Sequence, residues 1–210
     1  MIRVLVVDDH AVVREGLKRI LAEAGDITVA GEAVSEDEAL RQAAKRNCDV
    51  IVTDLTLQGR GGLELLKELR RGHPRVPVLI LSVHSEEQFA VRALKAGAAG
   101  YLTKETAPEE LVHAIRKVAR GGRYLSAAVA EQLANRLGAD SEAPPHERLS
   151  DREFQVLTII AQGKTVRQTA EELSLSVKTV STYRSRLLEK LGLSNTAEMV
   201  AYAIRNRLAE

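Results

Sequence analysis

The first 120 residues alternate short apolar runs, rich in β-branched side chains, with longer stretches in which apolar residues recur at helical spacing. The apolar runs predict five strands, at residues 2–7, 27–34, 49–54, 76–82 and 99–103. The helical spacing occupies residues 11–24, 35–46, 62–71, 86–97 and 108–120. Five strand–helix units in succession predict an α/β fold, a doubly wound sheet of five parallel strands.

Polar signals support the starts of two of these helices, and a change of pattern follows them. Ser35 with Glu38 is a capping-box pattern, and Pro108 lies where a first helical residue is expected. A further helical stretch covers residues 126–137. The segment GADSEAPPHE, residues 138–147, has a glycine, two adjacent prolines, mixed charge and no apolar periodicity, which indicates a flexible linker.

Beyond the linker the pattern is helical throughout. Ser150 with Glu153 and Thr165 with Gln168 are capping-box patterns, and Ser176 can cap another helix. These signals mark the starts of three helices.

The spacing of these helices is that of a helix-turn-helix. A helix over residues 165–173, a tight turn and a helix over residues 176–190 have this geometry, and a last helix covers residues 195–208. The sequence thus predicts three parts: a sheet domain at 1–122, a helix and linker at 123–147, and a small all-α four-helix domain at 148–210.

The composition is that of a globular protein. The 210 residues are 45% hydrophobic, which is enough for ordinary buried cores. No apolar run approaches the roughly 18 residues of a membrane span, and the start MIRVLVVDDH lacks the features of a secretory signal. Cys48, the one cysteine, excludes an internal disulfide and a cysteine-rich zinc site. We therefore expect a cytoplasmic protein with no membrane partner.

Charge is distributed unevenly along the chain. Residues 148–210 contain ten Lys or Arg and seven Asp or Glu, a charge of +3, whereas the whole chain carries +1, which leaves −2 for residues 1–147. The mildly basic C-terminal part is compatible with a nucleic-acid partner.

Polar side chains end four of the predicted strands. Asp8 and Asp9 end the first, Asp54 the third and Ser82 the fourth, while Lys104 follows the fifth. In an open parallel sheet the carboxyl ends of the strands line one crevice, so these side chains are expected to meet in space. A pair of acids after a strand is by itself usually a solvated loop, and the convergence with Asp54 and Lys104 favours a site.

Three clustered carboxylates need a cation. Two like charges about 4 Å apart cost roughly 4 kcal/mol at an effective dielectric constant near 20. A set of oxygen ligands favours Mg²⁺, which usually keeps waters and bridges to phosphate. Mg²⁺ and Lys104 together would neutralise a phosphoryl group, and Asp54, on the central strand, is the candidate nucleophile.

At these residues the chain resembles the receiver domain of two-component response regulators. The motifs VDDH, TDLTLQGRGGLELL, LSVH and AGAAGYLTKE match that family in order and spacing over residues 1 to about 120. The resemblance implies a flavodoxin-like sheet and a phosphoacceptor at Asp54. The chain departs from the family at Gln58, where many relatives have proline. The resemblance therefore does not predict how long the phosphoryl group stays on Asp54.

The resemblance also implies roles for the neighbouring residues. Magnesium would be held by Asp9, Asp54 and the backbone carbonyl of Thr56, with Asp8 acting through water. Ser82 and Tyr101 resemble a hydroxyl and aromatic switch pair, although Tyr101 could serve packing alone. Lys104 would bind the aspartyl phosphate, and this contact of its amine would form only with phosphate in place.

Other reactive side chains in this region receive no role in phosphate chemistry. His10, His84 and His113 are expected to serve structure or to lie in solvent, and Cys48 is expected to be a small buried residue.

The third helix of the C-terminal domain, SVKTVSTYRSRLLEK, has an apolar and a polar side. The apolar side is formed by Val177, Val180, Leu187, Leu188 and Leu191. The opposite side is formed by Lys178, Thr182, Ser185 and Glu189, flanked by Ser181 and Arg186. Short polar groups near a helix N-terminus suit base edges in the major groove, whereas Lys and Arg suit phosphates. A merely solvated face is the alternative for an isolated helix.

Residues from Leu149 to Ile204 resemble the LuxR-type helix-turn-helix, and with the receiver the chain is similar to a NarL/FixJ-type response regulator. The resemblance implies that a set of residues on the third helix faces DNA: Lys178, Ser181, Thr182, Arg184, Ser185, Arg186 and Lys190. Ser181 and Tyr183 replace the Lys and His of many members, so base preference is not transferable. Apolar positions of the last helix resemble a dimer contact, and packing within the domain explains them almost as well.

The sequence therefore predicts a phosphorylation-dependent transcription regulator. A histidine kinase would supply the phosphoryl group to Asp54, and the phosphorylated homodimer would bind promoter DNA and could contact RNA polymerase. It would be no enzyme beyond its own phosphorylation and dephosphorylation. One alternative is a magnesium-dependent aspartyl-phosphate phosphatase with a regulatory tail, which turnover of a phosphomonoester would support. The other is a DNA-binding regulator independent of phosphorylation, which failure to take phosphate would support.

Overall fold

The computed structural model describes residues 1–45, 47–57, 62–83, 86–127, 129–131, 134, 144–206 and 208. The chain divides into two compact units, residues 1–138 and 139–210. The boundaries expected after residues 122 and 147 stay predictions.

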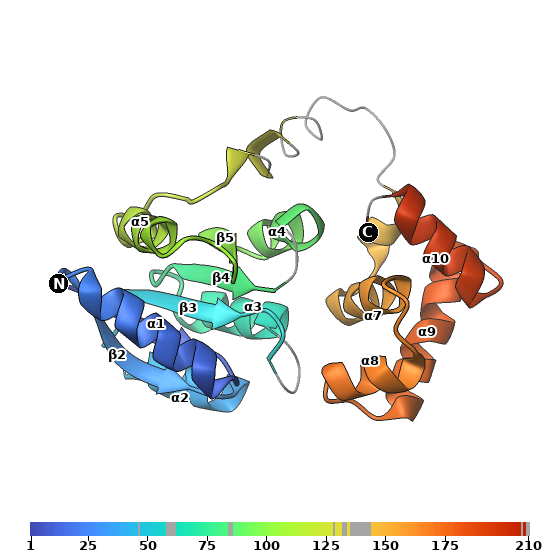
Figure 1. Ribbon diagram of the computed structural model, residues 1–210, viewed down its shortest axis with the longest axis horizontal. Coiled ribbons are helices and arrows are strands. Elements are labelled where there is room, and N and C mark those ends of the chain that lie inside the picture. The colour runs from blue at the N-terminus through green and yellow to red at the C-terminus, as the bar shows by residue number, and fades with distance from the viewer. Residues whose placement is uncertain are drawn as a thin grey trace. The chain divides into compact units, whose positions relative to one another are not determined.

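The first unit is built on a five-stranded parallel sheet (Figure 1). The strands are β1 (Ile2–Val7), β2 (Ile27–Ala33), β3 (Val50–Asp54), β4 (Val78–Ser82) and β5 (Gly100–Thr103), and they lie in the order β2-β1-β3-β4-β5. All neighbouring pairs are parallel. The sequence prediction of a doubly wound parallel sheet is confirmed.

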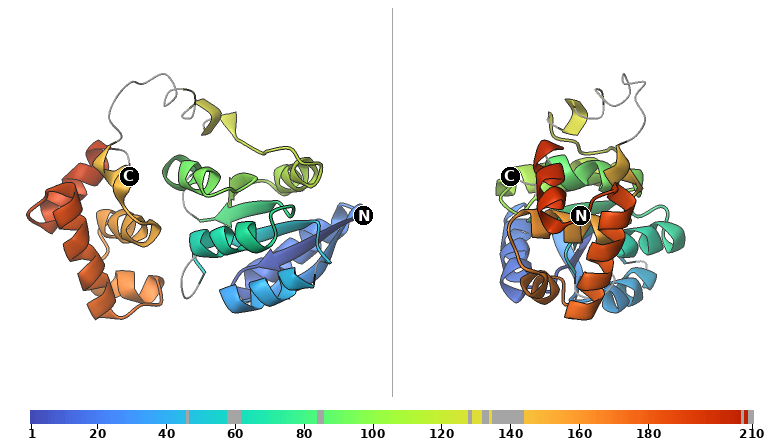
Figure 2. Two further views of the ribbon diagram at one scale, coloured as in Figure 1. Left: turned by 180° about the vertical axis from the view of Figure 1, so that it is seen from behind. Right: turned by 90° about the vertical axis from the view of Figure 1, so that its right-hand side faces the viewer.

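Helices cover both faces of this sheet. They are α1 (Ala11–Glu23), α2 (Glu36–Ala44), α3 (Gly62–Gly72), α4 (Glu86–Lys95) and α5 (Pro108–Ala119). Helices α1 and α5 lie on one face and α2, α3 and α4 on the other, as Figures 1 and 2 show. The expected caps are present, since Ser35 Oγ accepts from the Glu38 amide at 3.4 Å and Pro108 begins α5.

The core of the first unit lies between the sheet and these helices. The central strands β1, β3 and β4 are almost entirely buried, because helices pack on both of their faces. One core cluster joins alternate strand residues, such as Val4, Val52 and Leu79, to Leu21 of α1 and Ile115 of α5. Alternation along the strands sends the other residues to the opposite face. The sheet is therefore rigid, and its loops hold the site residues.

The described residues of the second unit form the 3₁₀ helix η1 (Pro145–Arg148) and four α-helices. These are α7 (Asp151–Ala161), α8 (Val166–Glu172), α9 (Val177–Leu191) and α10 (Thr196–Arg205). Helix α9 packs against α7 and α8, and α10 packs against α7. The expected capping boxes form at Ser150 and at Thr165, so the predicted helix starts are correct.

The last residues of the stretch expected to be a flexible linker are folded. Pro145, His146 and Glu147 belong to η1, and the buried His146 ring contacts the Tyr202 hydroxyl of α10 at 3.0 Å. A four-residue 3₁₀ helix leaves no apolar periodicity, so composition alone could not reveal it. Residues 135–143 lie outside the described part of the chain, as does much of the stretch expected as a helix from residue 126.

Two details of the C-terminal expectations differ from the structure. Val177 was placed on the apolar face of α9, but it is 51% exposed, because it is the first helical residue and precedes the stripe through which the helix packs. The last helix ends at Arg205 rather than at residue 208. Among the described residues, no helix is long and apolar enough to cross a membrane.

Candidate functional site

The carboxyl ends of four strands bring the expected site residues to one edge of the sheet. Asp8 follows β1, Asp54 ends β3, Ser82 ends β4 and Lys104 follows β5. Because β3 lies between β1 and β4, Asp54 is at the centre of this edge. The structure brings Asp8, Asp54 and Lys104 into direct contact, while their chemical roles stay predictions.

Lys104 joins the two most buried acids of the cluster. Its Nζ lies 2.8 Å from Asp54 Oδ2 and 2.7 Å from Asp8 Oδ2. Burial lowers the pKa of the Lys104 amine, but the charges and hydrogen bonds of the two carboxylates outweigh burial, so this pKa lies above its ordinary value. Lys104 contacts Asp54 already in the unphosphorylated protein, whereas the expected contact of its amine with a phosphoryl group stays a prediction. The ion pair forms with the unmodified carboxylates, because it offsets their mutual repulsion.

Asp54 is held at both carboxylate oxygens. Oδ2 accepts from Lys104, and Oδ1 accepts from the Thr56 amide at 3.1 Å and from the Thr56 hydroxyl at 3.4 Å. Only 2% of the residue is exposed. Its carboxylate is therefore fixed in position and turned into the cluster.

Asp8 is held from its own side of the edge. Asp8 Oδ1 accepts from the His10 amide at 2.8 Å, and the Asp8 carbonyl accepts from the Arg14 guanidinium at 2.8 Å. Arg14 and His10 were not assigned to the site from the sequence. Their positions immediately after the acid pair and one turn into α1 were the signals that could have indicated them.

Asp9 carries the feature that bears most directly on a metal. Its Oδ1 is buried and accepts no hydrogen bond from the described residues, and His10 Nδ1, at 2.9 Å, lies outside hydrogen-bonding geometry. A buried carboxylate oxygen without a donor is costly unless a cation satisfies it. Asp8, Asp9, His10 and Asp54 each offer one atom, and these four atoms lie within 4.8 Å of one another. The acidic cluster is compatible with Mg²⁺, since its carboxylate oxygens are the ligands that this ion prefers.

The expected switch residues are both buried. Ser82 is fully buried, and its carbonyl accepts from the Lys104 amide at 2.7 Å, which ties the lysine backbone to the end of β4. Tyr101 is 1% exposed and so already occupies an interior position. A switching role for either side chain stays a prediction. Gln58 and His84 lie outside the described residues.

His113 belongs to the structure on the far side of the receiver. Its ring packs edge-on against Tyr124, with the ring centroids 6.3 Å apart. The expectation that His113 has no part in phosphate chemistry stays a prediction.

The polar side of α9 is exposed, as a DNA-reading surface requires. Lys178, Ser181, Thr182, Ser185 and Arg186 are all exposed. The hydroxyls of Thr182 and Ser185 donate to the carbonyls of residues 178 and 181, at 3.0 and 3.1 Å. Because these hydroxyl protons are used within the helix, the free lone pairs suit donors on base edges.

Two of the residues expected to contact DNA also hold the domain together. Arg184 Nε donates to the Thr196 hydroxyl at 2.8 Å, and Lys190 Nζ lies 2.7 Å from Glu153 Oε2. Glu153 is 3% exposed and its other contacts form the capping box of α7, so Lys190 ties the end of α9 to the start of α7. The sequence did not indicate that Arg184 and Lys190 stabilise the domain through these contacts. Contact of either residue with DNA stays a prediction.

The parallel sheet with its acidic edge and lysine, joined to a helix-turn-helix unit, defines a receiver with a DNA-binding effector. The response regulator receiver domain matches residues 4–116, and the LuxR family of bacterial regulatory proteins matches residues 147–203. The chain belongs to the two-component response regulators of the NarL/FixJ type. Members are DNA-binding transcription regulators rather than classical enzymes, and the phosphatase alternative is thereby disfavoured.

Curated relatives and solved structures agree with this assignment. The chain is 42% identical to the response regulator GacA of Pseudomonas protegens, over 100% of this chain and 99% of the relative. It is 39% identical to the response regulator UvrY of Escherichia coli, over 99% and 96%. A crystal structure of the response regulator ChrA, from a heme-sensing two-component system, has 35% identity and a TM-score of 0.55 over 99% and 98%. The response regulator RcsB in complex with DNA has 26% identity and a TM-score of 0.60, over 96% of each chain.

Proposed function

We propose that this regulator accepts a phosphoryl group on Asp54 from a partner histidine kinase, and that the phosphoryl group controls its binding to promoter DNA. The observation that carries the proposal is the contact of the Lys104 amine with Asp54 at 2.8 Å, inside a buried cluster that also holds the unsatisfied Asp9 oxygen. A nucleophilic carboxylate, a cation for the phosphoryl oxygens and a metal-compatible acid pair thus lie together.

The transfer forms one bond and breaks one. A carboxylate oxygen of Asp54 attacks phosphorus, and the phosphorus–nitrogen bond of a phosphohistidine breaks with its electron pair left on the imidazole nitrogen. Thr56 and Lys104 fix the carboxylate, which lowers the entropic cost of alignment. Mg²⁺, held by Asp8, Asp9, Asp54 and the Thr56 backbone carbonyl, would neutralise charge on the phosphoryl oxygens.

Lys104 then has two sets of partners. In the unphosphorylated site it neutralises Asp8 and Asp54, and in the phosphorylated site its charge is needed at the new phosphoryl oxygens. Because the Lys104 amide is bonded to the end of β4, a shift of the lysine is mechanically connected to Ser82. Ser82 and Tyr101 are the side chains that we propose to rearrange.

On the effector side, the exposed polar face of α9 is proposed to enter the major groove. Lys178, Ser181, Thr182 and Ser185 would face bases, and Arg186 would face phosphate. The complex of the relative RcsB with DNA supports this use of the domain. A homodimer of the phosphorylated protein, and contact of that dimer with RNA polymerase, complete the proposal.

The phosphoacceptor is tested by labelling. With Mg²⁺ and a small phosphodonor such as acetyl phosphate, the protein should gain one acid-stable, base-labile phosphoryl group, because acyl phosphates are attacked by hydroxide. Asp54→Asn should abolish labelling, whereas Asp26→Asn, at an exposed acid paired with Arg116, should label as the parent does. Equal labelling of Asp54→Asn at another residue would show the acceptor assignment to be wrong. No labelling of the parent would favour a phosphorylation-independent regulator.

A further inference from the structure

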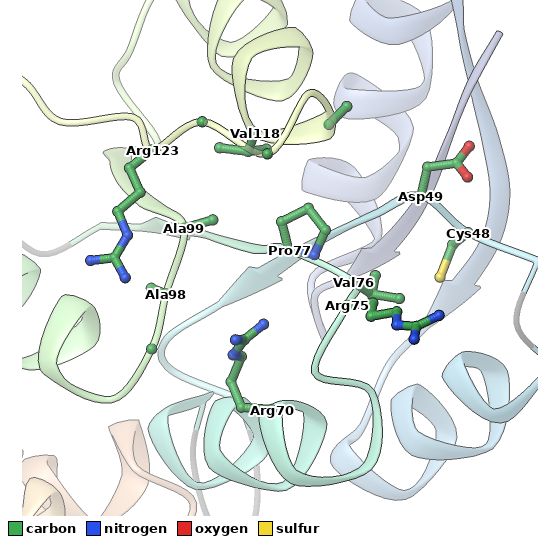
Figure 3. Close-up of a pocket in the computed structure, with 14 residues that line it drawn as sticks. Cys48, Asp49, Arg70, Arg75, Val76, Pro77, Ala98, Ala99, Val118 and Arg123 are labelled. Carbon is green, nitrogen blue, oxygen red and sulfur yellow. The ribbon is translucent and has the colours of Figure 1, made fainter.

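A hollow of about 490 Å³ lies at the edge of the receiver sheet opposite to Asp54. Its walls come from the segments that enter β3, β4 and β5, from the end of α3 and from the turn that follows α5 (Figure 3). Asp49 precedes β3 and lines the hollow, while Asp54 ends the same strand. A strand of this length spans roughly 16 Å, so the hollow is separate from the phosphorylation site. Its volume is within the range of sites for small molecules.

Three arginines from different parts of the chain line this hollow: Arg70 of α3, Arg75 of the loop before β4, and Arg123 of the turn after α5. In Figure 3 the Arg70 side chain rises into the middle of the hollow toward Pro77 and Ala98. The Arg123 guanidinium lies at one end of the hollow, and the Arg75 guanidinium lies toward the other end. Guanidinium groups placed in this way suit phosphate and carboxylate, which they bind through paired hydrogen bonds.

The acid in this hollow does not neutralise the three arginines. Asp49 accepts three hydrogen bonds from Arg3, which include the contact of Arg3 Nη2 with Asp49 Oδ1 at 2.8 Å. These contacts lower the pKa of the Asp49 carboxyl, with the Arg3 hydrogen bond as the largest cause. The charge of Asp49 is therefore balanced by Arg3, and the positive charge of the three arginines that line the hollow is not neutralised by this acid.

The arginines keep donors for a ligand. Arg70 uses Nη1 on the Pro74 carbonyl at 2.7 Å, which fixes the side chain and leaves its other N–H groups. Within the described part of the chain, Arg75 and Arg123 make no hydrogen bond or ion pair. By contrast, Arg71 and Arg116 on the same domain are each paired with an acid.

Apolar side chains form part of the lining between the arginines. Val76, Pro77 and Ala99 are partly exposed and offer apolar surface, whereas Ala98 and Val118 are buried. Burial of an apolar group of a ligand against Val76, Pro77 and Ala99 is favourable.

We propose that this hollow binds a small organic phosphate, a molecule with a flat apolar body and one or more phosphate groups, of about the size of a nucleoside monophosphate. The phosphate would lie between Arg70 and Arg123, and the body would lie on Pro77 and Ala99.

Such a ligand would contact the segment that leads out of the receiver. Gly121, Gly122 and Arg123 line the hollow, and the next residue, Tyr124, pairs with Gly100 of β5. The Tyr124 amide donates to the Ala99 carbonyl at 2.9 Å, and Ala99 also lines the hollow. Occupancy would therefore stabilise the attachment of this segment to the sheet, beside Tyr101.

The test uses the full chain, free of metal, with AMP and inorganic phosphate as separate probes in isothermal titration calorimetry. One AMP should bind with a Kd below roughly 1 mM, and inorganic phosphate should bind at least roughly tenfold more weakly, because it lacks the apolar body. Arg70→Ala and Arg123→Ala should each weaken AMP binding at least roughly tenfold. The matched controls are Arg71→Ala and Arg120→Ala, which change neighbouring arginines that do not line the hollow and should leave the Kd within about twofold.

A second readout locates the ligand. In amide NMR spectra of the full chain, AMP should shift the resonances of Gly97, Gly121 and Gly122 and leave those of Lys178 and Arg186 in place. Absence of saturable AMP binding would overturn the proposal. So would binding that persists in the Arg70 and Arg123 double variant, shifts confined to α9, or equal affinities for AMP and inorganic phosphate.

Discussion

At the scale of single residues, the receiver site is defined by one amine shared between two buried acids. Lys104 Nζ contacts Asp8 and Asp54 at 2.7 and 2.8 Å, and 13% of its side chain is exposed. The lysine therefore balances the negative charge of the two acids in the unphosphorylated protein.

Removal of this amine should destabilise the receiver, and Mg²⁺ should reverse the effect. Lys104→Ala leaves clustered carboxylates without their cation, at a cost of roughly 3 kcal/mol in the free energy of unfolding. Because the metal no longer competes with the amine, Mg²⁺ should raise the melting temperature of Lys104→Ala more than that of the parent. The exposed Lys45→Ala is the control. Equal magnesium-dependent shifts in all three proteins would contradict the contact.

The same ion pair predicts the sign of a pH dependence. The pKa of Lys104 is raised in the folded protein, so its contribution to stability is complete below the ordinary lysine pKa of about 10.4. This contribution is lost as the pH rises through the raised value. The free energy of unfolding, measured with urea, should fall more steeply above about pH 10 for the parent than for Lys104→Met. Parallel curves for the two proteins would argue against a raised pKa.

Gly62 controls the approach of α3 to the acceptor strand. A Cβ at this position would lie 2.3 Å from the Asp54 carbonyl oxygen and 2.7 Å from Leu55 Cα. Gly62→Ala must therefore displace the backbone that holds Asp54, and we expect a loss of about 1–3 kcal/mol together with slower phosphorylation. Gly72→Ala, at the other end of the helix with nothing within 4 Å, should change neither. Urea unfolding and phosphodonor labelling measure the two effects.

The sequence allowed the identities of the site residues to be predicted but not all their contacts. Asp8, Asp54 and Lys104 were expected together because strand ends converge in a parallel sheet. The position of Lys104 between two acids, the unsatisfied Asp9 oxygen and the involvement of His10 depend on side-chain rotamers, about which the order of residues says little.

At the scale of elements, the helix starts were predictable because caps are local. Ser35, Ser150, Thr165 and Asn195 each accept from the amide three residues on. The contacts between elements were not predictable in this way. The ion pair of Lys190 with Glu153 joins residues 37 positions apart, and η1 docks through His146 on Tyr202.

Helix α9 offers a pair of basic residues with different expected effects. Arg186 is exposed, so Arg186→Ala should weaken binding to all DNA sequences alike and reduce the salt slope by about one unit, without loss of stability. Lys190→Ala should also destabilise the effector domain, because it leaves the buried Glu153 without its cation. DNA titrations at several salt concentrations and hydrogen exchange of α9 amides separate the two. Identical hydrogen exchange in the two variants would contradict a stabilising role of the Lys190–Glu153 ion pair.

The hydroxyl side of α9 carries the expected sequence preference. Thr182→Val keeps the shape of the side chain but removes its free acceptor, so it should change the preferred bases more than the overall affinity. Selection of binding sites from a random DNA library with the parent and the variant measures this. A uniform loss of affinity with the same preferred sequence would place this face away from the bases.

At the scale of the whole molecule, a phosphoryl group on Asp54 is proposed to couple two folded units. The receiver ends in a segment anchored by Tyr124 to β5, and the effector begins at η1, which is anchored by His146 to α10. The sequence showed that a connection lies between them, but the extent of the anchored parts depends on burial of two aromatic rings, which leave no periodic pattern. A change from 1:99 to 99:1 between inactive and active states needs about 5.5 kcal/mol of differential stabilisation. One hydrogen bond contributes about 1 kcal/mol, so the contacts of Lys104, the metal and the dimer must act together.

The central claim, that a phosphoryl group on Asp54 controls association and DNA binding, is tested most directly by sedimentation and DNA titration of the intact protein. Each is measured with Mg²⁺, with and without a phosphodonor, for the parent and for Asp54→Asn. We expect phosphorylation to raise both the dimer fraction and the affinity for DNA in the parent, and we expect Asp54→Asn to respond in neither measurement. A parent that is labelled on Asp54 yet keeps the same dimer fraction and the same affinity would contradict the central claim.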